Sequence, residues 1–452
     1  MEVSIISKET LKPSSLPLDV KPHKLCLFDQ ITPFTYASIM VFYRITDPNF
    51  DVGETLAQLK KSFLETLTLF YPLSGRPKKN LYVDDFDAGV TYVEAKVSCT
   101  FTDYFKLRQN ELLDKFVPFP PFRNETDTSK PQYGFQVNVF ACGSIAISTS
   151  LGHKIADGGS LSYFLMCWST AFRGFPHKII KPNVSDAPKV FPPREDFPEK
   201  YQTLMNQLWF KKGNFVTRRF VFNARSVAAL REMAKSEHVP NPSRNEAVSC
   251  FVWKHATAAS WAVSGSAKAS IVAHAVNMRP RLKSQVLNTS IGNLFWWAMA
   301  DSDKAAEEEL QKLVGKMRES LVNFSNEYLE SLEGDVGFAA VSDFFDKMEG
   351  ILTSEPENAP DIYGFSNWKG FFNEVNFGWG KPIWVGAHGK VGSEFRNQVF
   401  FVDAQGGEGI ETFVTLEEKH MAALENDPKF LAFASPNPEE VPGGNIYGFS
   451  HY

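Results

Sequence analysis

Residues 135–174 read FQVNVFACGSIAISTSLGHKIADGGSLSYFLMCWSTAFRG. Apolar residues alternate with polar or small ones from Phe135 to Ala141 and again from Ile145 to Leu151, with a Cys-Gly-Ser break between the two runs. This period of two predicts a β-hairpin. Apolar residues then recur every three or four positions from Leu161 to Phe172, which predicts a helix that Gly174 can end. A strand, a short junction and a helix therefore follow one another.

The junction between this strand and helix, residues 152–159, is a polar cluster flanked by glycines and lies between two buried elements. Such a position suits a functional site, and its histidine, His153, is the first candidate for chemistry. A histidine without further context is more often structural than catalytic. His153 and Asp157 are four residues apart and could share one helical face as metal ligands, but the nearby sequence offers no third ligand, so we expect no metal site.

A proline-rich segment divides the chain. Six prolines lie between Phe175 and Lys200, which is too many for a helix or a central strand, and we expect a crossover linker over residues 176–215. It separates an N-terminal domain over residues 1–175 from a C-terminal domain over residues 216–452. Both fall within the usual size range of domains.

The second part of the chain mixes helical and extended patterns. Ser243 and Glu246 have the spacing of a capping box ahead of an apolar helix. The other expected elements are strands at 220–222, 270–277 and 398–402 and helices at 227–234 and 304–320. The predicted class is therefore α/β or mixed α+β.

Composition excludes several classes of function. The net charge of −5, from 47 basic and 52 acidic residues, gives no electrostatic footprint for nucleic acid or an anionic membrane. Five cysteines without a CxxC motif indicate neither a disulfide framework nor a zinc ribbon. No secretory signal pattern and no run of 18 apolar residues occurs, so we expect a cytoplasmic protein with no membrane or nucleic-acid partner, and a monomer.

Common catalytic motifs are also absent. The sequence contains no G-x-S-x-G elbow, no G-x-x-x-x-G-K-[ST] and no G-x-G-x-x-G, which argues against a serine hydrolase and against nucleotide chemistry. Forty of the aromatic residues are Phe, which suits a thick core or an apolar pocket. Phe295-Trp296-Trp297 and Phe371-Phe372 are the aromatic runs that could line such a pocket.

Two motifs carry a resemblance that covers nearly the whole chain. Residues 153–158, HKIADG, resemble the HxxxDG motif of the plant BAHD acyltransferases, and residues 376–382, NFGWGKP, resemble their DFGWGKP signature. Further blocks similar to the family follow in the family's order: Phe70–Arg76, Gln136–Asn138, Val276–Arg279, Gly292–Phe295 and Gly409–Ile410. The similarity is closest to members that acylate alkaloids, terpenoids or acylsugars.

The resemblance implies two similar-sized domains of the chloramphenicol-acetyltransferase-like type, with a channel between them and the segment around 365–385 packed at their interface. It implies transfer of an acyl group from coenzyme A, a co-substrate rather than a bound cofactor, to a small-molecule alcohol or amine. His153 is then the general base that takes the acceptor proton, and direct transfer needs no acyl-enzyme.

The resemblance also suggests roles for other residues. Asp157 is either a structural partner of Arg279 or the orienting member of a triad with His153. Trp379 either donates its indole N–H to the oxyanion or shapes the channel wall. Ser243 and Arg244 either contact the phosphates of coenzyme A at a helix N-terminus or, in the case of Ser243, only cap that helix.

The second signature departs from the family at one position, because Asn376 stands where the family usually has Asp. If that Asp forms a structural ion pair, Asn376 leaves a cation less compensated, and we expect a structural rather than catalytic effect. Gly378 and Gly380 complete this structural motif.

The predicted function is therefore transfer of a short acyl group, acetyl first, from coenzyme A to a hydroxyl of a plant specialised metabolite such as an alkaloid or terpenoid. The alternatives are malonyl transfer, with Arg396 or Arg279 as the cation, and acylsugar acylation. A non-catalytic descendant of the fold is a third alternative, and an esterase with a nucleophile such as Ser148, Ser150 or Ser160 is a fourth.

Overall fold

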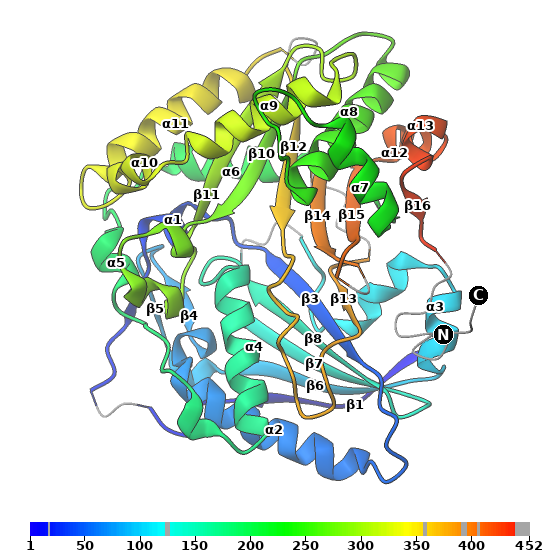
Figure 1. The fold of residues 1–452 in the computed structure, drawn as a ribbon. Helices are drawn as coiled ribbons and strands as arrows, with labels where there is room; N and C mark the ends of the chain where they lie inside the picture. The colour runs from blue at the N-terminus through cyan, green and yellow to red at the C-terminus, as the bar shows by residue number, and fades with distance from the viewer. Residues whose placement is uncertain (17–18, 123–126, 356–358, 390–395, 405–406, 439–452) are drawn as a thin grey trace.

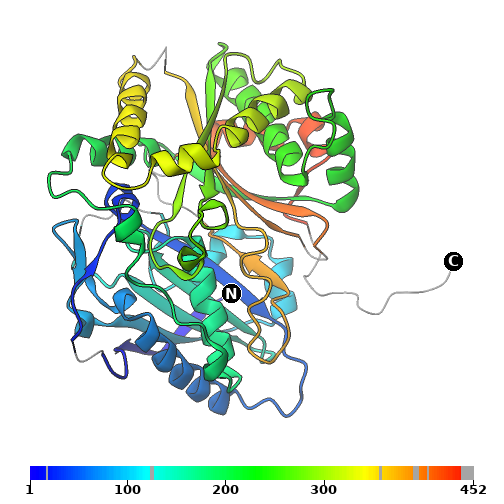
Figure 2. The ribbon, with the colours of Figure 1, turned by 60° about the vertical axis from the view of Figure 1, so that its left-hand side comes forward.

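The computed structural model describes residues 1–16, 19–122, 127–355, 359–389, 396–404 and 407–438. Two domains, each built on one large β-sheet flanked by helices, lie one above the other in Figure 1 and in the rotated view of Figure 2. This architecture confirms the predicted mixed α/β class. Among the described residues, no helix has both the length and the apolar character needed to cross a membrane.

The first sheet contains the predicted hairpin. β7 and β8 pair antiparallel with Val137 opposite Ile147, as the alternating pattern predicts. Helices α2 (Val52–Leu69) and α4 (Gly158–Phe172) pack on this sheet (Figure 1). In spatial order the sheet comprises β1 (Val3–Leu11), β6 (Val90–Val97), β7 (Tyr133–Phe140), β8 (Ile145–Gly152), β3 (Tyr36–Tyr43) and β13 (Trp384–Gly386).

The second sheet is mixed and confirms the strands predicted at 270–277 and 398–402. In spatial order it comprises β11 (Phe295–Ser302), β10 (Ser270–Asn277), β12 (Asp361–Asn367), β14 (Gln398–Asp403), β15 (Ile410–Glu417), β9 (Phe215–Phe222) and β16 (Ser435–Pro436). Its outer helices are α7 (Ala224–Met233), α8 (Arg244–Ser264), α9 (Leu310–Val322), α12 (Glu418–Glu425) and α13 (Pro428–Leu431).

The remaining elements are short or connect the two sheets. A small sheet is formed by β2 (His23–Lys24), β5 (Tyr82–Asp84) and β4 (Arg76–Lys78). The helices not yet named are α1 (Leu27–Ile31), α3 (Phe101–Lys106), α5 (Ala187–Val190), α6 (Glu199–Trp209), α10 (Asn326–Ser331) and α11 (Gly337–Leu352).

The helix expected over residues 304–320 begins later, at Leu310. The Lys254 ammonium of α8 donates to the carbonyl oxygens of Ala306 and Glu308. If the helix began earlier, these two oxygens would accept hydrogen bonds from backbone N–H groups of the helix itself. Residues 304–309 consequently form turns instead. The prediction was wrong at this boundary because a distant lysine competes for the backbone.

Three connections join the sheets, and the structure describes two of them in full. The segment expected as a linker, 176–215, contains the 11-residue helix α6, which starts directly after Pro198. The second connection follows β12 and descends across the first domain (Figure 1) until β13 pairs with β3, placing Trp384 opposite Phe42. The two sheets therefore do not divide the chain at a single point.

Helix α4 is held firmly against the first sheet. The Trp168 ring packs edge-on against Phe135 of β7 at 4.4 Å, and its indole N–H donates to the carbonyl oxygen of Leu59 on α2. Phe63 of α2 fills the space between them. Full burial of one such phenylalanine contributes about 1.5–3 kcal/mol. The junction that carries His153 thus lies between two rigid elements.

Candidate active site

His153 follows the last residue of β8, and its backbone N–H donates to the carbonyl oxygen of Thr35 at 2.7 Å, next to the start of β3. Its imidazole Nδ1 lies 3.0 Å from the side-chain Oδ1 of Asn293, which belongs to the second domain. The His153 ring also contacts Trp209 and Phe295 edge-on, at 5.2 and 5.6 Å. The histidine is therefore fixed from both domains.

Asn293 determines which nitrogen of His153 carries the proton. The Asn293 Nδ2 group donates to Asp29 Oδ1 at 2.9 Å and to the His153 carbonyl oxygen at 2.7 Å, so its Oδ1 faces the imidazole. An amide oxygen only accepts hydrogen bonds, and Nδ1 must therefore be the protonated nitrogen. The lone pair of His153 lies on Nε2, which is the nitrogen a general base needs.

The surroundings of His153 keep it neutral at physiological pH. Burial lowers the pKa of its imidazole below the ordinary value of 6.5, although the nearby carboxylate of Asp157 acts in the opposite direction. A neutral imidazole can accept a proton at once.

Asp157 does not hydrogen-bond His153 in the described structure. Asp157 caps the N-terminus of α4, because its Oδ1 accepts from the backbone N–H of Ser160 and also from the Ser160 hydroxyl. Its Oδ2 accepts from Leu294 N at 2.9 Å. The same oxygen lies 2.7 Å from Nη1 of Arg279, and both side chains are buried. Burial would raise the Asp157 pKa, but Arg279 and the backbone donors bring it below its usual value. The geometry fits the structural alternative for Asp157 better than a triad.

A cavity opens beside His153 between the two sheets, and its empty space, including the solvent at its mouth, is about 860 Å³. Among the described lining residues, the titratable side chains are the neutral His153 and the already paired Asp157, and the uncharged polar side chains are Asn277, Ser366, Asn367 and Gln398. Nine aromatic residues dominate the lining: Phe122, Trp209, Phe295, Trp297, Phe365, Trp368, Phe371, Phe372 and Phe400. Such a lining suits a bulky apolar ligand.

Small residues in the second sheet make room for this cavity. Residues directly opposite each other in a sheet point to the same face, and the row across β11, β10, β12 and β14 reads Trp297, Ala275, Ser366 and Phe400. All four line the cavity. Large rings at the two ends of the row and small side chains in its centre therefore form a hollow. Because the four residues come from four different strands, the hollow is not visible in the sequence.

The aromatic runs singled out from the sequence contribute unequally. Phe295, Trp297, Phe371 and Phe372 line the cavity, as expected. Trp296 does not, because it points to the opposite face of β11, where its indole N–H donates to the hydroxyl of Tyr328.

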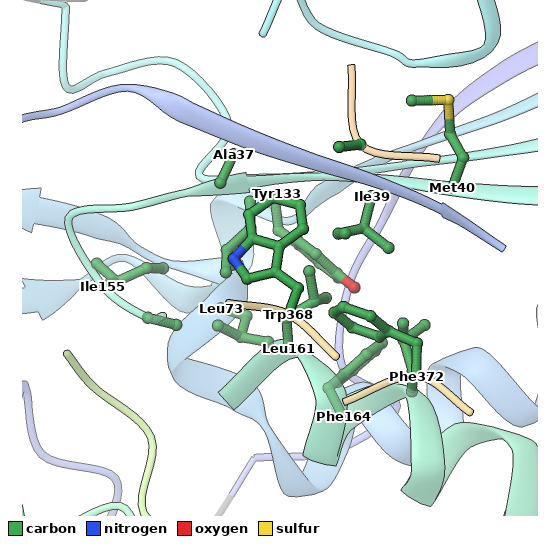
Figure 3. Packing of buried hydrophobic residues seen from close by; sticks show 14 of the residues in the cluster. Ala37, Ile39, Met40, Leu73, Tyr133, Ile155, Leu161, Phe164, Trp368 and Phe372 are labelled. Atoms are coloured by element: carbon green, nitrogen blue, oxygen red, sulfur yellow. The ribbon is translucent and has the colours of Figure 1, made fainter. Parts of the chain in front are cut away.

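Trp368 enters the cavity wall from the second connection between the sheets. Figure 3 shows its ring and that of Phe372 packed among Ala37 and Ile39 of β3 and Leu161 and Phe164 of α4. A Cβ atom added to Gly158 would lie 3.9 Å from the Trp368 indole nitrogen, so this N–H lies beside the first turn of α4. It has no hydrogen-bond partner within the described part of the chain.

Trp379 lies elsewhere, which corrects the expectation of an oxyanion or channel-wall role. Its ring packs edge-on against Tyr43, Phe50 and Phe172, at 5.3–5.7 Å. Phe172 ends α4, whereas the cavity touches its first residue, Gly158, and at 1.5 Å per residue these ends are about 20 Å apart. The indole of Trp379 therefore cannot reach the reacting atoms.

Asn376 organises the loop around Trp379. Its Oδ1 accepts from the backbone N–H groups of Gly378, at 2.7 Å, and Gly380, at 3.2 Å. Both glycines have positive φ angles, 99° and 94°, which other residues rarely adopt. The side chain of Arg173 runs beside Gly378, because a Cβ there would lie 3.8 Å from its Cγ. Asn376, the residue that differs from the family signature, therefore lies in a turn whose backbone its own side chain holds in place.

Ser243 and Arg244 lie outside the cavity lining, as does Arg396. The Ser243 hydroxyl accepts from Glu246 N in the predicted capping box, and Arg244 donates to the carbonyl oxygens of Gly407 and Glu408. Arg396 lines a separate opening of about 330 Å³. Neither Arg396 nor the paired Arg279 is available to an acyl group beside His153.

The serines considered as alternative nucleophiles are also engaged elsewhere. Ser148 accepts from Asn138, Ser150 lies 3.4 Å from the hydroxyl of Ser38, and Ser160 donates to Asp157. None of the three lines the described cavity.

Sequence reasoning assigned no role to Trp368 and Gln398 of the lining, and it missed Asn293 and Asp29, which hold His153. Asn293 stands in a block used for the resemblance, but its pairing with His153 spans 140 residues. Asp29 caps the short helix α1 and accepts from Asn293 N at 2.7 Å. Nothing in the local pattern of either residue indicates these contacts.

Comparisons with known proteins agree over nearly the whole chain. The Transferase family model matches residues 1–431. The chain is 37% identical to the limonoid 7-O-acetyltransferase of Citrus sinensis, over 97% of this chain and 99% of that protein. It is 34% identical to akuammiline synthase 2 of Alstonia scholaris, over 97% and 98% of the two chains. The crystal structure of vinorine synthase matches with a TM-score of 0.80 and 28% identity, covering 96% of this chain and 99% of that one.

Proposed function

Since the chain belongs to the BAHD Transferase family of acyl-CoA-dependent acyltransferases, we propose that it moves an acetyl group from acetyl-CoA to a hydroxyl of a large, mostly apolar terpenoid or alkaloid alcohol. The observation that carries this proposal is the unprotonated Nε2 of His153 beside a cavity lined mainly by aromatic residues.

His153 acts as the general base. The acceptor hydroxyl gives its proton to Nε2 as its oxygen attacks the thioester carbonyl carbon, and a C–O bond forms. The tetrahedral intermediate then collapses, the C–S bond breaks, and the imidazolium returns the proton to the thiolate of coenzyme A. Asn293 and Asp29 stabilise the tautomer that this cycle needs.

Trp368 is our candidate for stabilising the oxyanion, in place of Trp379. Its indole N–H lies beside Gly158 and is not used by another described residue. A preorganised donor at the position where charge develops lowers the barrier more than one that must reorient. Ser162 of α4 donates to the carbonyl oxygen of Phe371, which supports the segment that carries Trp368.

The lining of the cavity favours an uncharged acyl group. A malonyl group carries a carboxylate that needs a cation, and no lysine or arginine is among the described lining residues. Acetyl transfer is therefore preferred over malonyl transfer. Four neutral polar side chains among nine aromatic ones likewise favour a terpenoid or alkaloid over a sugar ester.

Residues outside the cavity have supporting roles. We propose that the Asp157–Arg279 ion pair positions the His153 junction against the second domain. Ser243 and Arg244 at the start of α8 remain our proposed contacts for the phosphates of coenzyme A. We also propose that the enzyme is a cytosolic monomer; light scattering after gel filtration tests the monomer, and cell fractionation tests the location.

The test is an assay of purified enzyme with acetyl-CoA and a panel of limonoid, alkaloid and acylsugar alcohols, following release of the free thiol. We expect acceptor-dependent release that is highest for a limonoid or alkaloid alcohol. In His153→Ala the rate should fall about 10²- to 10⁴-fold with unchanged circular dichroism. Thiol release without any acceptor dependence, or a fully active His153→Ala variant, would refute the proposal. A higher kcat/KM with malonyl-CoA would refute the donor assignment.

A further inference from the structure

Gln398 is the first residue of β14, and its side chain lines the cavity beside the aromatic rings. The residue is only 8% exposed. Its amide has no hydrogen-bond partner among the residues that the structure describes, whether donor or acceptor. A buried amide without a partner is unfavourable unless a ligand or water completes its hydrogen bonds.

The sheet is shaped to hold this amide at the cavity surface. Gly364 of β12 lies directly opposite Gln398, and a Cβ atom added there would lie 2.2 Å from Gln398 Oε1 and 2.3 Å from Nε2. The amide plane therefore rests on the glycine. Any larger residue at position 364 would displace it.

The two other side-chain amides of the cavity, those of Asn277 and Asn367, differ from that of Gln398. Asn277 Oδ1 accepts from Arg279 N at 3.2 Å, and Asn367 Oδ1 accepts from Lys369 N at 3.2 Å. Each of these amides has its oxygen committed to the protein. Gln398 keeps both a donor and an acceptor for whatever occupies the cavity.

We propose that Gln398 is a specificity-determining residue, whose amide hydrogen-bonds a polar group of the acceptor scaffold other than the hydroxyl that is acylated. The inference rests on the proposed function for the identity of the acceptor as a polycyclic alcohol. A carbonyl or a second hydroxyl on the scaffold satisfies the amide, whereas a scaffold without one leaves it unpaired. A site of this kind rejects the analogue that lacks the polar group.

The probes are epiandrosterone, a tetracyclic alcohol with a ketone at the far end, and 5α-androstan-3β-ol, which is the same alcohol without the ketone. Three tryptophans line the cavity, so quenching of tryptophan fluorescence reports binding without acetyl-CoA. The wild-type enzyme should bind the ketone about tenfold more tightly. In Gln398→Met, a near-isosteric variant without hydrogen bonds, this preference should disappear.

Gln136→Met is the matched control. Gln136 is 3% exposed, and its Nε2 donates to the Lys115 carbonyl oxygen and to Asn138 Oδ1 in the first sheet. This variant should lower the Tm and keep the ketone preference. Gln398→Met should leave the Tm unchanged or raise it, because it removes an unpaired amide. A merely structural role for Gln398 would produce the opposite pattern in Tm.

The inference is overturned if the ketone preference survives in Gln398→Met, if the wild type shows no preference, or if neither steroid binds saturably. A rise in the KM for acetyl-CoA in Gln398→Met, rather than weaker ketone binding, would assign the amide to the pantetheine chain and also overturn it. Because binding is measured without turnover, an enzyme that prefers the ketone yet transfers no acetyl group would refute the proposed function alone.

Discussion

Asn293 Oδ1 lies 3.0 Å from Nδ1 of His153, while the Nδ2 group of the same amide donates to Asp29. One amide thus links a buried carboxylate to the proposed base and assigns the proton on the imidazole. Because Asn293 comes from the second domain and His153 from the first, the base has its reactive tautomer only when the domains are packed together.

Replacing Asn293 by Ala should lower kcat about 10- to 100-fold, because the imidazole loses the partner that fixes its tautomer and orientation. Steady-state kinetics with a saturating acceptor measure the effect. Asn110→Ala is the control, since Asn110 is also buried and donates to two backbone carbonyls remote from His153. Equal losses of kcat in the two variants would contradict the tautomer role of Asn293.

The acidic limb of the pH profile should lie below pH 6.5. Burial lowers the pKa of His153 from that value, and the active form is the neutral imidazole. Activity is therefore retained as pH falls to 6.5 and is lost only as pH falls through the lower, folded-state pKa. The profile of kcat/KM with a neutral alcohol, which has no titrating group, gives this midpoint. A midpoint above pH 6.5 would contradict this prediction, because it would mean that the Asp157 carboxylate raises the pKa of His153 more than burial lowers it.

Asp157→Asn should reduce stability more than chemistry. Removal of one partner leaves the buried Arg279 guanidinium uncompensated, which typically costs about 3–5 kcal/mol. Thermal melting and the specific activity of the folded fraction separate the two effects. Lys283→Met, which breaks the exposed pair with Glu330, should leave the Tm unchanged. Lost activity at an unchanged Tm in Asp157→Asn would support a triad with His153.

Asn376→Asp should be tolerated and should raise the Tm slightly. A carboxylate accepts from Gly378 and Gly380 as the amide oxygen does, and its negative charge strengthens both hydrogen bonds. Activity should not change, because this loop lies at the far end of α4 from the cavity. Differential scanning calorimetry of the two proteins decides the point, and a clear loss of stability would mean that the turn has adapted to a neutral side chain.

Local patterns in the sequence were sufficient for much of the fold. The hairpin of β7 and β8, the helix α4 that follows it and the capping box of α8 were all predictable, because alternation, helical spacing and caps depend on neighbours within a few residues. The position of His153 at a strand–helix junction followed from the same patterns. The start of α9 did not, because Lys254 reaches it from another helix.

The site as a whole depended on tertiary structure. Trp368 and Trp379 are both tryptophans in the glycine-containing segment between β12 and β13. Only the path of this segment through space places Trp368 at the cavity and Trp379 against Phe172. Asn293 hydrogen-bonds His153, and the Gln398 amide packs on Gly364. Both contacts join residues of separate elements. Contacts between distant segments leave no periodic pattern in the sequence. The sequence by itself therefore indicated His153 as the proposed base, and the packing of the two sheets decided which residues surround it.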